Sequence, residues 1–233
     1  MKYFTKITSA VMAGVMVLSM SSCSLFGGSK IGPSALVKYA KSVDAAEFEP
    51  DDFMDLMDDL SGGNPDFDDI EDGAYVTLEG KDIKTYFKKD TVGTGDTGTT
   101  LGYDKSMKTA SVYYIGEIQD SSRRWVAAAI SIDFESKEDA ENYFEDAIDQ
   151  IEDGFEEIKS YVHVDTDDGE EDGINYFIAN CDFSISDIGI CEGIYQQGNA
   201  VLFILGCDLG TSEADGVVEE ICEAMNVIDP SEA

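Results

Sequence analysis

VAAAISIDF, residues 126–134, and VLFILGCDL, residues 201–209, are two nearly all-apolar segments of this 233-residue chain. Segments of this composition favour strands that are buried on both faces of a sheet. Each follows another strand-like segment, at 111–119 and 188–196, and each precedes a helical pattern. This order of elements predicts an α+β domain with a mostly antiparallel sheet, in which the two quoted segments are the central strands.

The remaining strands follow from runs of β-branched and aromatic residues between turn residues. Two hairpins are expected, one closed by the polar turn 120–123 and one by residues 197–199. The strands that we expect, in chain order, are 74–78, 111–119, 125–134, 161–164, 174–182, 188–196 and 200–208.

Two helices are expected in the C-terminal half. One begins near Lys137, with Ser136 as its N-cap and Asp139 in a near capping box, and the other covers 213–225. Apolar residues recur along one side of each helix, so we expect both helices to pack on one face of the sheet.

The two β-β-α units resemble each other, which indicates a possible internal duplication. In both units an Asp, then a hydroxyl residue that could cap the helix, then a Glu follow the long strand. The matching pairs are Asp133 with Asp208, Ser136 with Thr211, and Glu138 with Glu213. Identity is low, so common β-β-α order explains the match equally well.

The N-terminal part of the mature chain reads as acidic and helical. Pro33 stands at a plausible first helical position, and a second helix begins at Pro50. Residues 61–73 are a loop, and 82–89 are ambiguous between helix and strand. We therefore divide the chain into an acidic helical segment, 33–73, and an α+β domain, 74–233.

The first 23 residues, MKYFTKITSAVMAGVMVLSMSSC, have a basic start and a short apolar stretch from Ile7 to Met20. This layout is typical of a secretory signal peptide, and the stretch is too short to span a membrane. Met20-Ser21-Ser22-Cys23 resembles the lipobox of bacterial lipoprotein precursors. An ordinary cleaved signal peptide would need an A-x-A-like site, which this segment lacks.

The lipoprotein resemblance implies where in the cell the protein is located. Residues 1–22 would be removed, Cys23 would carry the lipid, and 23–32 would form a flexible tether. The protein would then be anchored to the outer face of the bacterial cytoplasmic membrane, or to the outer membrane, by the lipid on Cys23.

The charge of the chain restricts its partners. The formal net charge is −34, and removal of residues 1–22 leaves 13 basic against 49 acidic residues, or −36. Nucleic acid is therefore not expected as a partner, because phosphate binding needs a basic surface. Anionic headgroups would also repel the chain, so the acyl chains must supply the membrane attachment.

Motifs for catalysis and cofactors are weak. Residues 93–98 match G-x-G-x-x-G but lack the strand before and the helix after that dinucleotide binding requires, so a Thr/Gly loop is the better interpretation. His163 is the only histidine and falls on the polar side of a short strand. Among 49 acids a carboxylate pair arises by chance, so we expect no cofactor and assign no catalytic residue.

The acid-rich stretch after His163 offers weak calcium ligands, because crowded carboxylates on a loop can bind this ion. A solvated loop between two strands is the simpler interpretation. The candidate ligands are Asp165, Asp167, Asp168 and Glu170.

Four cysteines of the exported part could form disulfides or remain free. Cys207 and Cys222 fall on apolar core positions, where a free cysteine behaves as a small hydrophobe. A two-residue hairpin turn would also put Cys191 and Cys207 on opposite faces of the sheet. We therefore predict buried free thiols for these residues and Cys181.

These observations favour a non-enzymatic binding or assembly module at the cell surface, with an unknown protein or carbohydrate ligand. The alternative is a surface hydrolase that uses a carboxylate pair. A cleft with convergent acids and apolar walls would favour the enzyme. An exposed aromatic patch, for example from Tyr113, Trp125 or Tyr195, would favour binding.

Overall fold

A computed structural model of the chain describes residues 29–61, 70–87, 102–120, 123–158, 162–183 and 188–232. The predicted signal peptide, Cys23 and the 93–98 loop lie outside these ranges. The described residues form one eight-stranded sheet with helices packed against it, so the predicted α+β class is confirmed. Among them no helix is both long and apolar enough to cross a membrane.

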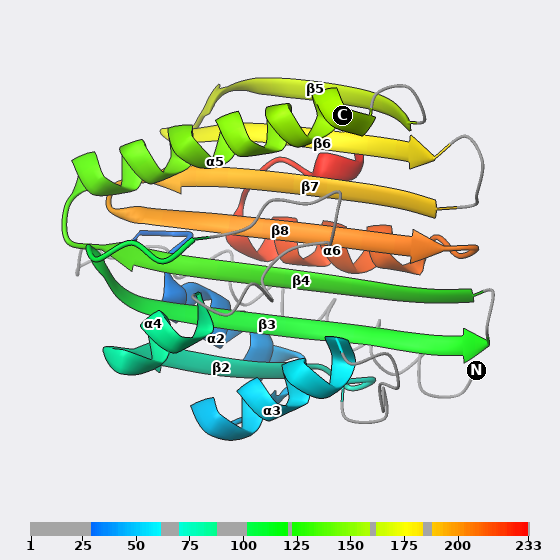
Figure 1. Cartoon of the computed structure of the whole chain (residues 1–233), viewed down its shortest axis with the longest axis horizontal. Coiled ribbons are helices and arrows are strands. Elements are labelled where there is room, and N and C mark those ends of the chain that lie inside the picture. Colours follow the sequence, from blue (N-terminus) through cyan, green and yellow to red (C-terminus); the bar gives the residue numbers. More distant parts are fainter. Residues whose placement is uncertain are drawn as a thin grey trace.

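The sheet has the strand order β1-β2-β3-β4-β8-β7-β6-β5, and Figure 1 shows it from β2 near the bottom to β5 at the top. The strands are β1 Ala46–Glu47, β2 Ala74–Glu79, β3 Met107–Asp120, β4 Arg123–Phe134, β5 Val162–Glu171, β6 Ile174–Phe183, β7 Ile188–Gln197 and β8 Ala200–Leu209. All neighbours are antiparallel except β1 and β2. The apolar strands β4 and β8 pair at the centre, as their composition predicts.

Four of the helices begin close to their predicted positions, at Pro33, Pro50, Lys137 and Glu213. The helices are α2 Pro33–Ser42, α3 Pro50–Ser61, α4 Lys81–Tyr86, α5 Lys137–Ile158, α6 Glu213–Met225 and a 3-10 helix, η2, at Pro230–Glu232. Pro33 and Pro50 begin their helices, since a proline at the first helical position sacrifices no hydrogen bond. The ambiguous segment 82–89 forms most of α4 in its described part.

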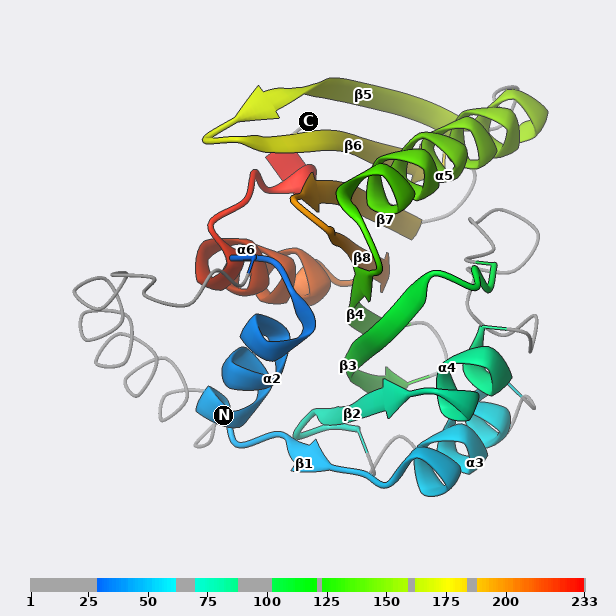
Figure 2. The same ribbon diagram turned by 90° about the vertical axis from the view of Figure 1, so that its left-hand side faces the viewer.

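The sheet is covered on both faces, so the prediction that α5 and α6 share one face is wrong (Figure 2). On β8, Val201 and Phe203 point to the face that carries α5, α3 and α4, whereas Leu202 and Ile204 point to the face that carries α6 and α2. We call these the α5 face and the α6 face. Both faces of β8 are therefore buried, which is why its sequence shows no polar alternation.

The connections to α5 and α6 explain why the two helices separate. Ser136 caps α5 as predicted, because its Oγ accepts the Asp139 amide at 3.1 Å. At α6 the predicted hydroxyl cap is wrong: the buried Asp208 carboxylate accepts the Ala214 amide at 3.1 Å, and Thr211 only donates to Asp208. Gly210 adopts a left-handed φ of 65° in this connection, which turns the chain onto the α6 face.

This separation bears on the possible duplication. β4 and β8 are antiparallel neighbours, with β3 and β7 outside them. A two-fold rotation that exchanges the two hairpins must run perpendicular to the sheet, and such a rotation would keep both helices on one face. Because α5 and α6 lie on opposite faces, no such rotation relates the two units. Shared β-β-α order is the better explanation of their resemblance.

Strand β5 corrects a second prediction. The acid-rich residues after Val164 are not a loop, because β5 pairs with β6 as far as Glu171 and turns at Asp172 and Gly173. β5 is the last strand of the sheet, so its acids reach water on both sides. Charge on an edge strand also discourages pairing with another chain. Sequence alternation fails here because neither face of this half of β5 is buried.

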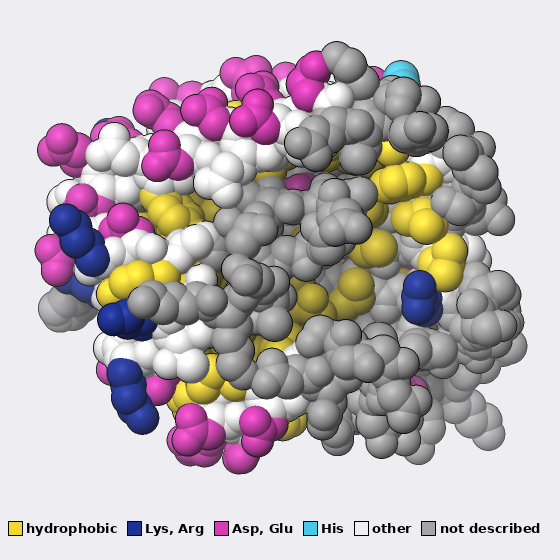
Figure 3. Space-filling model, viewed as in Figure 1, with side chains coloured by type: hydrophobic (Ala, Val, Ile, Leu, Met, Phe, Trp, Pro, Cys, Tyr) yellow, Lys and Arg dark blue, Asp and Glu magenta, His cyan; other side chains and the backbone are white. Residues whose placement is uncertain are grey.

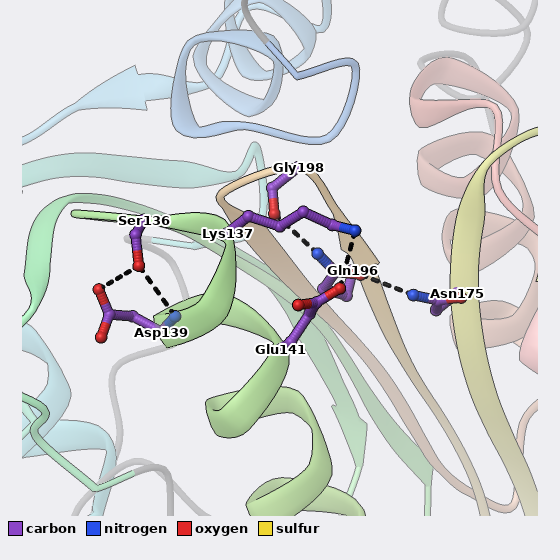
Figure 4. A network of polar contacts seen from close by, with 7 residues as sticks. All are labelled: Ser136, Lys137, Asp139, Glu141, Asn175, Gln196 and Gly198. Carbon is purple, nitrogen blue, oxygen red and sulfur yellow. Dashed lines mark hydrogen bonds and ion pairs between the residues drawn. The ribbon is translucent and has the colours of Figure 1, made fainter.

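At one end of the sheet, polar side chains around the β7–β8 turn contact one another and the turn backbone, as Figure 4 shows. Gln196 is buried, receives a hydrogen bond from Asn175 at 2.7 Å and donates to the Gly198 carbonyl at 2.7 Å. Lys137, at the start of α5, pairs with Glu141 at 2.8 Å nearby. We call this the Gly198 end; it includes the β5–β6 turn and the end of β4.

Candidate functional site

A groove of about 780 Å³ lies on the α6 face near the Gly198 end. Its lining residues come from the β5–β6 hairpin, β7, the C-terminal end of α6 and the segment that follows α6. Figure 2 shows α6 on this face of the sheet, near β5 and β6. We call it the α6 groove. Its acidic lining residues are Glu171, Asp172, Glu219, Glu223 and Asp229, and its apolar and aromatic ones include Ile174, Tyr176, Tyr195, Val227 and Ile228.

Two tyrosines build the floor, and each lies over a glycine. Tyr195 is fully buried and donates from its hydroxyl to the Ile228 carbonyl at 2.5 Å. Its ring covers Gly193, where a Cβ would come within 2.7 Å of Tyr195 Cζ. Tyr176 covers Gly169 in the same way and donates to Asp167 at 3.2 Å. The glycines are therefore needed for the rings to lie flat on the strands.

The wall of the groove is the last part of α6. The helix ends at Asn226, whose left-handed φ of 55° lets the Val227 amide reach the Cys222 carbonyl at 3.0 Å. This turn sends the chain back along the groove toward Asp229. The Asp229 carboxylate accepts the amide and hydroxyl of Ser231, both at 2.8 Å, which fixes the far rim.

The electrostatics of the groove are negative throughout. Among its described lining residues, five are carboxylates and none is Lys or Arg. The carbonyl end of a helix carries partial negative charge, and α6 has no basic residue in its last turn to offset it. Burial raises the pKa of the neighbouring Glu220 carboxyl, and Glu223 and Glu219 raise it further. The chemical complement of this groove is a cation.

The calcium candidates do not converge on one ion. Successive side chains of a strand point to opposite faces, so Asp165 and Asp167 lie on the α6 face, and Asp168 and Glu170 lie on the α5 face. The described part of the chain contains no group of three or more His, Cys, Asp or Glu that could hold a metal. Figure 3 shows acidic side chains spread over α5 and β5 on the side of the molecule in view.

His163 lies where the alternation of its strand predicts, exposed on β5. Its Nε2 is 3.3 Å from Asp165 Oδ2, and both side chains are largely in water. Among the described residues, no serine or cysteine is hydrogen-bonded to His163.

The four cysteines are free thiols, and all but the half-buried Cys207 are buried. Ala200 pairs with Gln197, so the hairpin turn has two residues and puts Cys191 and Cys207 on opposite faces, as predicted. Burial raises the pKa of Cys222, at the groove floor, well above its usual range. The neutral thiol is a poor nucleophile, so Cys222 contributes packing rather than reactivity.

The aromatic patch that would favour binding is absent at the positions we named. Tyr113, Trp125 and Tyr195 are all buried under helices of the α6 face. A cleft with convergent acids and apolar walls does exist, which is the feature that favours an enzyme. A carboxylate pair, however, needs one acid with a raised pKa. The described carboxyls with raised pKa, Asp133, Asp215 and Glu220, do not line the groove.

The groove itself was missed by the sequence reasoning, because it joins segments from three parts of the chain. Two signals were available. α6 carries acids but no base near its C-terminal end, and glycines stand two residues before Tyr195 and seven before Tyr176.

Comparisons with known proteins assign no family to the chain. No protein family model and no curated protein matches the chain. A solved structure with similarity is the extracellular domain of PknH from Mycobacterium tuberculosis, at 12% sequence identity and a TM-score of 0.31. The match covers 52% of this chain and 66% of that one. What the fold and the groove define is an α+β protein with an acidic, tyrosine-floored groove.

Proposed function

We propose that the protein is a lipid-anchored extracytoplasmic binding module whose α6 groove takes a Lys- or Arg-rich segment of a partner protein. The observation that carries the proposal is the described lining of the groove, in which five carboxylates surround an apolar and tyrosine floor and no residue is basic. The lipobox-like residues before Cys23 support the anchor.

The rim and the floor of the groove each suit one part of a basic side chain. Carboxylates on the rim attract the charged head, and the apolar floor accepts the aliphatic stem, as in other settings where Lys and Arg bury their stems. Tyr176 is half-buried and presents a ring to a cation, a contact that favours Arg in particular. The volume lies within the range of small-ligand sites, so a few side chains fill it.

A surface hydrolase is the second candidate, and the convergence of acids between apolar walls is the observation that favours it. Its weakness is that the carboxyls with raised pKa lie outside the groove. Hydrolysis of a sugar polymer that is lost in a Glu219→Gln/Glu223→Gln variant would replace the binding proposal with this one.

The anchor is tested by changing Cys23→Ala and following the protein by membrane fractionation with metabolic acyl labelling. We expect loss of the label and of membrane retention, with an unchanged melting temperature, because Cys23 lies before the packed domain. Equal retention of the variant would contradict the anchor.

The groove is tested by isothermal titration of a decalysine peptide into the full chain in detergent. We expect saturable binding that the Glu219→Gln/Glu223→Gln variant weakens about tenfold, or roughly 1.4 kcal/mol. A matched control, Glu138→Gln/Glu152→Gln on α5, removes the same charge from the other face and should change affinity little. Equal weakening in both variants would mean diffuse charge rather than a groove site.

A further inference from the structure

The chain enters the packed domain directly beside the α6 groove. Ser29 Oγ and the Lys30 amide donate to Gln197 Oε1 at 3.1 and 2.9 Å. Ile31 is fully buried, and its carbonyl accepts from Ser131 Oγ at 2.6 Å. The last residues of the predicted tether, 29–32, are therefore held against the domain, which leaves residues 23–28 of the sequence between this contact and Cys23.

Gln197 and Tyr195 connect this entry point to the groove. They lie two residues apart on β7, so they share the α6 face with their Cα atoms about 7 Å apart. Tyr195 is the floor of the groove, and Gln197 holds Ser29. The groove is thus next to the point where the chain departs.

The remaining tether is short. Six residues, Cys23 to Gly28, span at most about 21 Å when fully extended. Adding the separation of Gln197 and Tyr195 keeps the groove floor within roughly 30 Å of a lipid on Cys23. β4 alone is about 40 Å long. The tether is therefore shorter than the domain, and it cannot raise the groove above the membrane by one domain length.

We infer that the ligand of the α6 groove is a basic segment presented at the membrane surface, the juxtamembrane stretch of another membrane protein. This inference rests on the proposed function. Anionic headgroups repel the anchored chain, whose formal net charge is −36 without residues 1–22, but attract a basic segment. A basic stretch close to the bilayer is attracted by the headgroups and by the groove at once, and it lies within reach of the short tether.

The test varies height above the membrane with stiff spacers on vesicles that contain phosphatidylglycerol. The lipidated chain and a lipid-linked decalysine share each vesicle, and energy transfer reports binding. The peptide is attached either directly or through a polyproline spacer of roughly 20 residues, which rises about 60 Å. A second protein carries the same spacer between Gly28 and Ser29.

We expect the native protein to bind the directly attached peptide at least about tenfold better than the raised one, because the groove sits within roughly 30 Å of the bilayer. The spacer in the protein should reverse this preference and leave the affinity for free decalysine in solution unchanged. Equal binding of both peptides by the native protein would overturn the inference alone. Failure to bind free decalysine in solution would overturn the proposed function and this inference with it.

Discussion

Glu219 and Glu223 lie one helical turn apart on the wall of the α6 groove, close to the negative end of the α6 dipole. Like charges four residues apart weaken a helix, and acids near its C-terminus weaken it further. The two residues therefore lower the stability of the helix they belong to. A cation bound between them would reverse both effects, which is the energetic pattern expected of a binding site.

Neutralising this pair should stabilise the protein. We expect Glu219→Gln/Glu223→Gln to raise the free energy of unfolding by about 0.5 to 1 kcal/mol, measured by urea denaturation. Glu138→Gln is a control that should lower the free energy of unfolding, because Glu138 stands in the first turn of α5, where the helix dipole favours an acid. A less stable double variant would show that the two acids have a structural role instead.

The floor of the groove should depend on Gly193. An added Cβ would come within 2.7 Å of Tyr195 Cζ, so we expect Gly193→Ala to displace the ring and cost about 1 to 3 kcal/mol of stability. The same variant should bind decalysine more weakly. Gly189→Ala on the same strand meets nothing within 4 Å and serves as the control. Equal stability of the two variants would contradict the described floor.

Acid should stabilise the fold before it denatures it. The pKa of Glu220 is raised by burial and by its neighbours Glu223 and Glu219, and burial raises that of Asp133. A raised carboxyl pKa contributes stability that is fully present below the unfolded value and is lost as the pH rises through the folded one. The melting temperature should therefore rise as the pH falls from 7 toward about 5. Glu220→Gln should flatten this rise, and an unchanged slope would contradict the assignment.

The thiols should stay free and slow to react. Burial raises the pKa of Cys181 to about 12 and raises those of Cys191 and Cys222 further, so little thiolate exists near neutral pH. Cys181 and Cys207 share the α5 face but lie two strands apart, about 10 Å, which is too far for a disulfide. Mass spectrometry after alkylation of unreduced protein should show four alkylated cysteines only after unfolding. Disulfide bridges in stoichiometric amounts would contradict the free thiols described on the two faces of the sheet.

Most strands and helices could be read from the sequence because each depends on a local pattern; β1 and the second half of β5 could not. β4, β8 and α6 lie where the sequence predicts them. The N-cap Ser136 and the helix-starting prolines Pro33 and Pro50 are signals that depend only on nearby residues. The face that each helix covers could not be read, since it depends on how Gly210 and Asp208 direct one connection.

The groove and the acid-rich part of strand β5 after Val164 were missed for a different physical reason. The acids of β5 carry no alternation because β5 is an edge strand and both faces of its acid-rich half are exposed. The groove exists only where the β5–β6 turn, α6 and the segment around Asp229 meet. Its residues are 58 positions apart at the extremes, from Glu171 to Asp229, so no local pattern marks them as a group.

The most direct test of the central claim is an amide NMR titration of the protein with decalysine. The α6 groove predicts saturable shifts at Ile174, at Glu223 and along the segment from Asn226 to Asp229. It predicts little change at the acids of α5 and at Asp168 on β5, which face water elsewhere. Shifts that grow without saturation over α5 and β5, and leave the groove unchanged, would contradict the account.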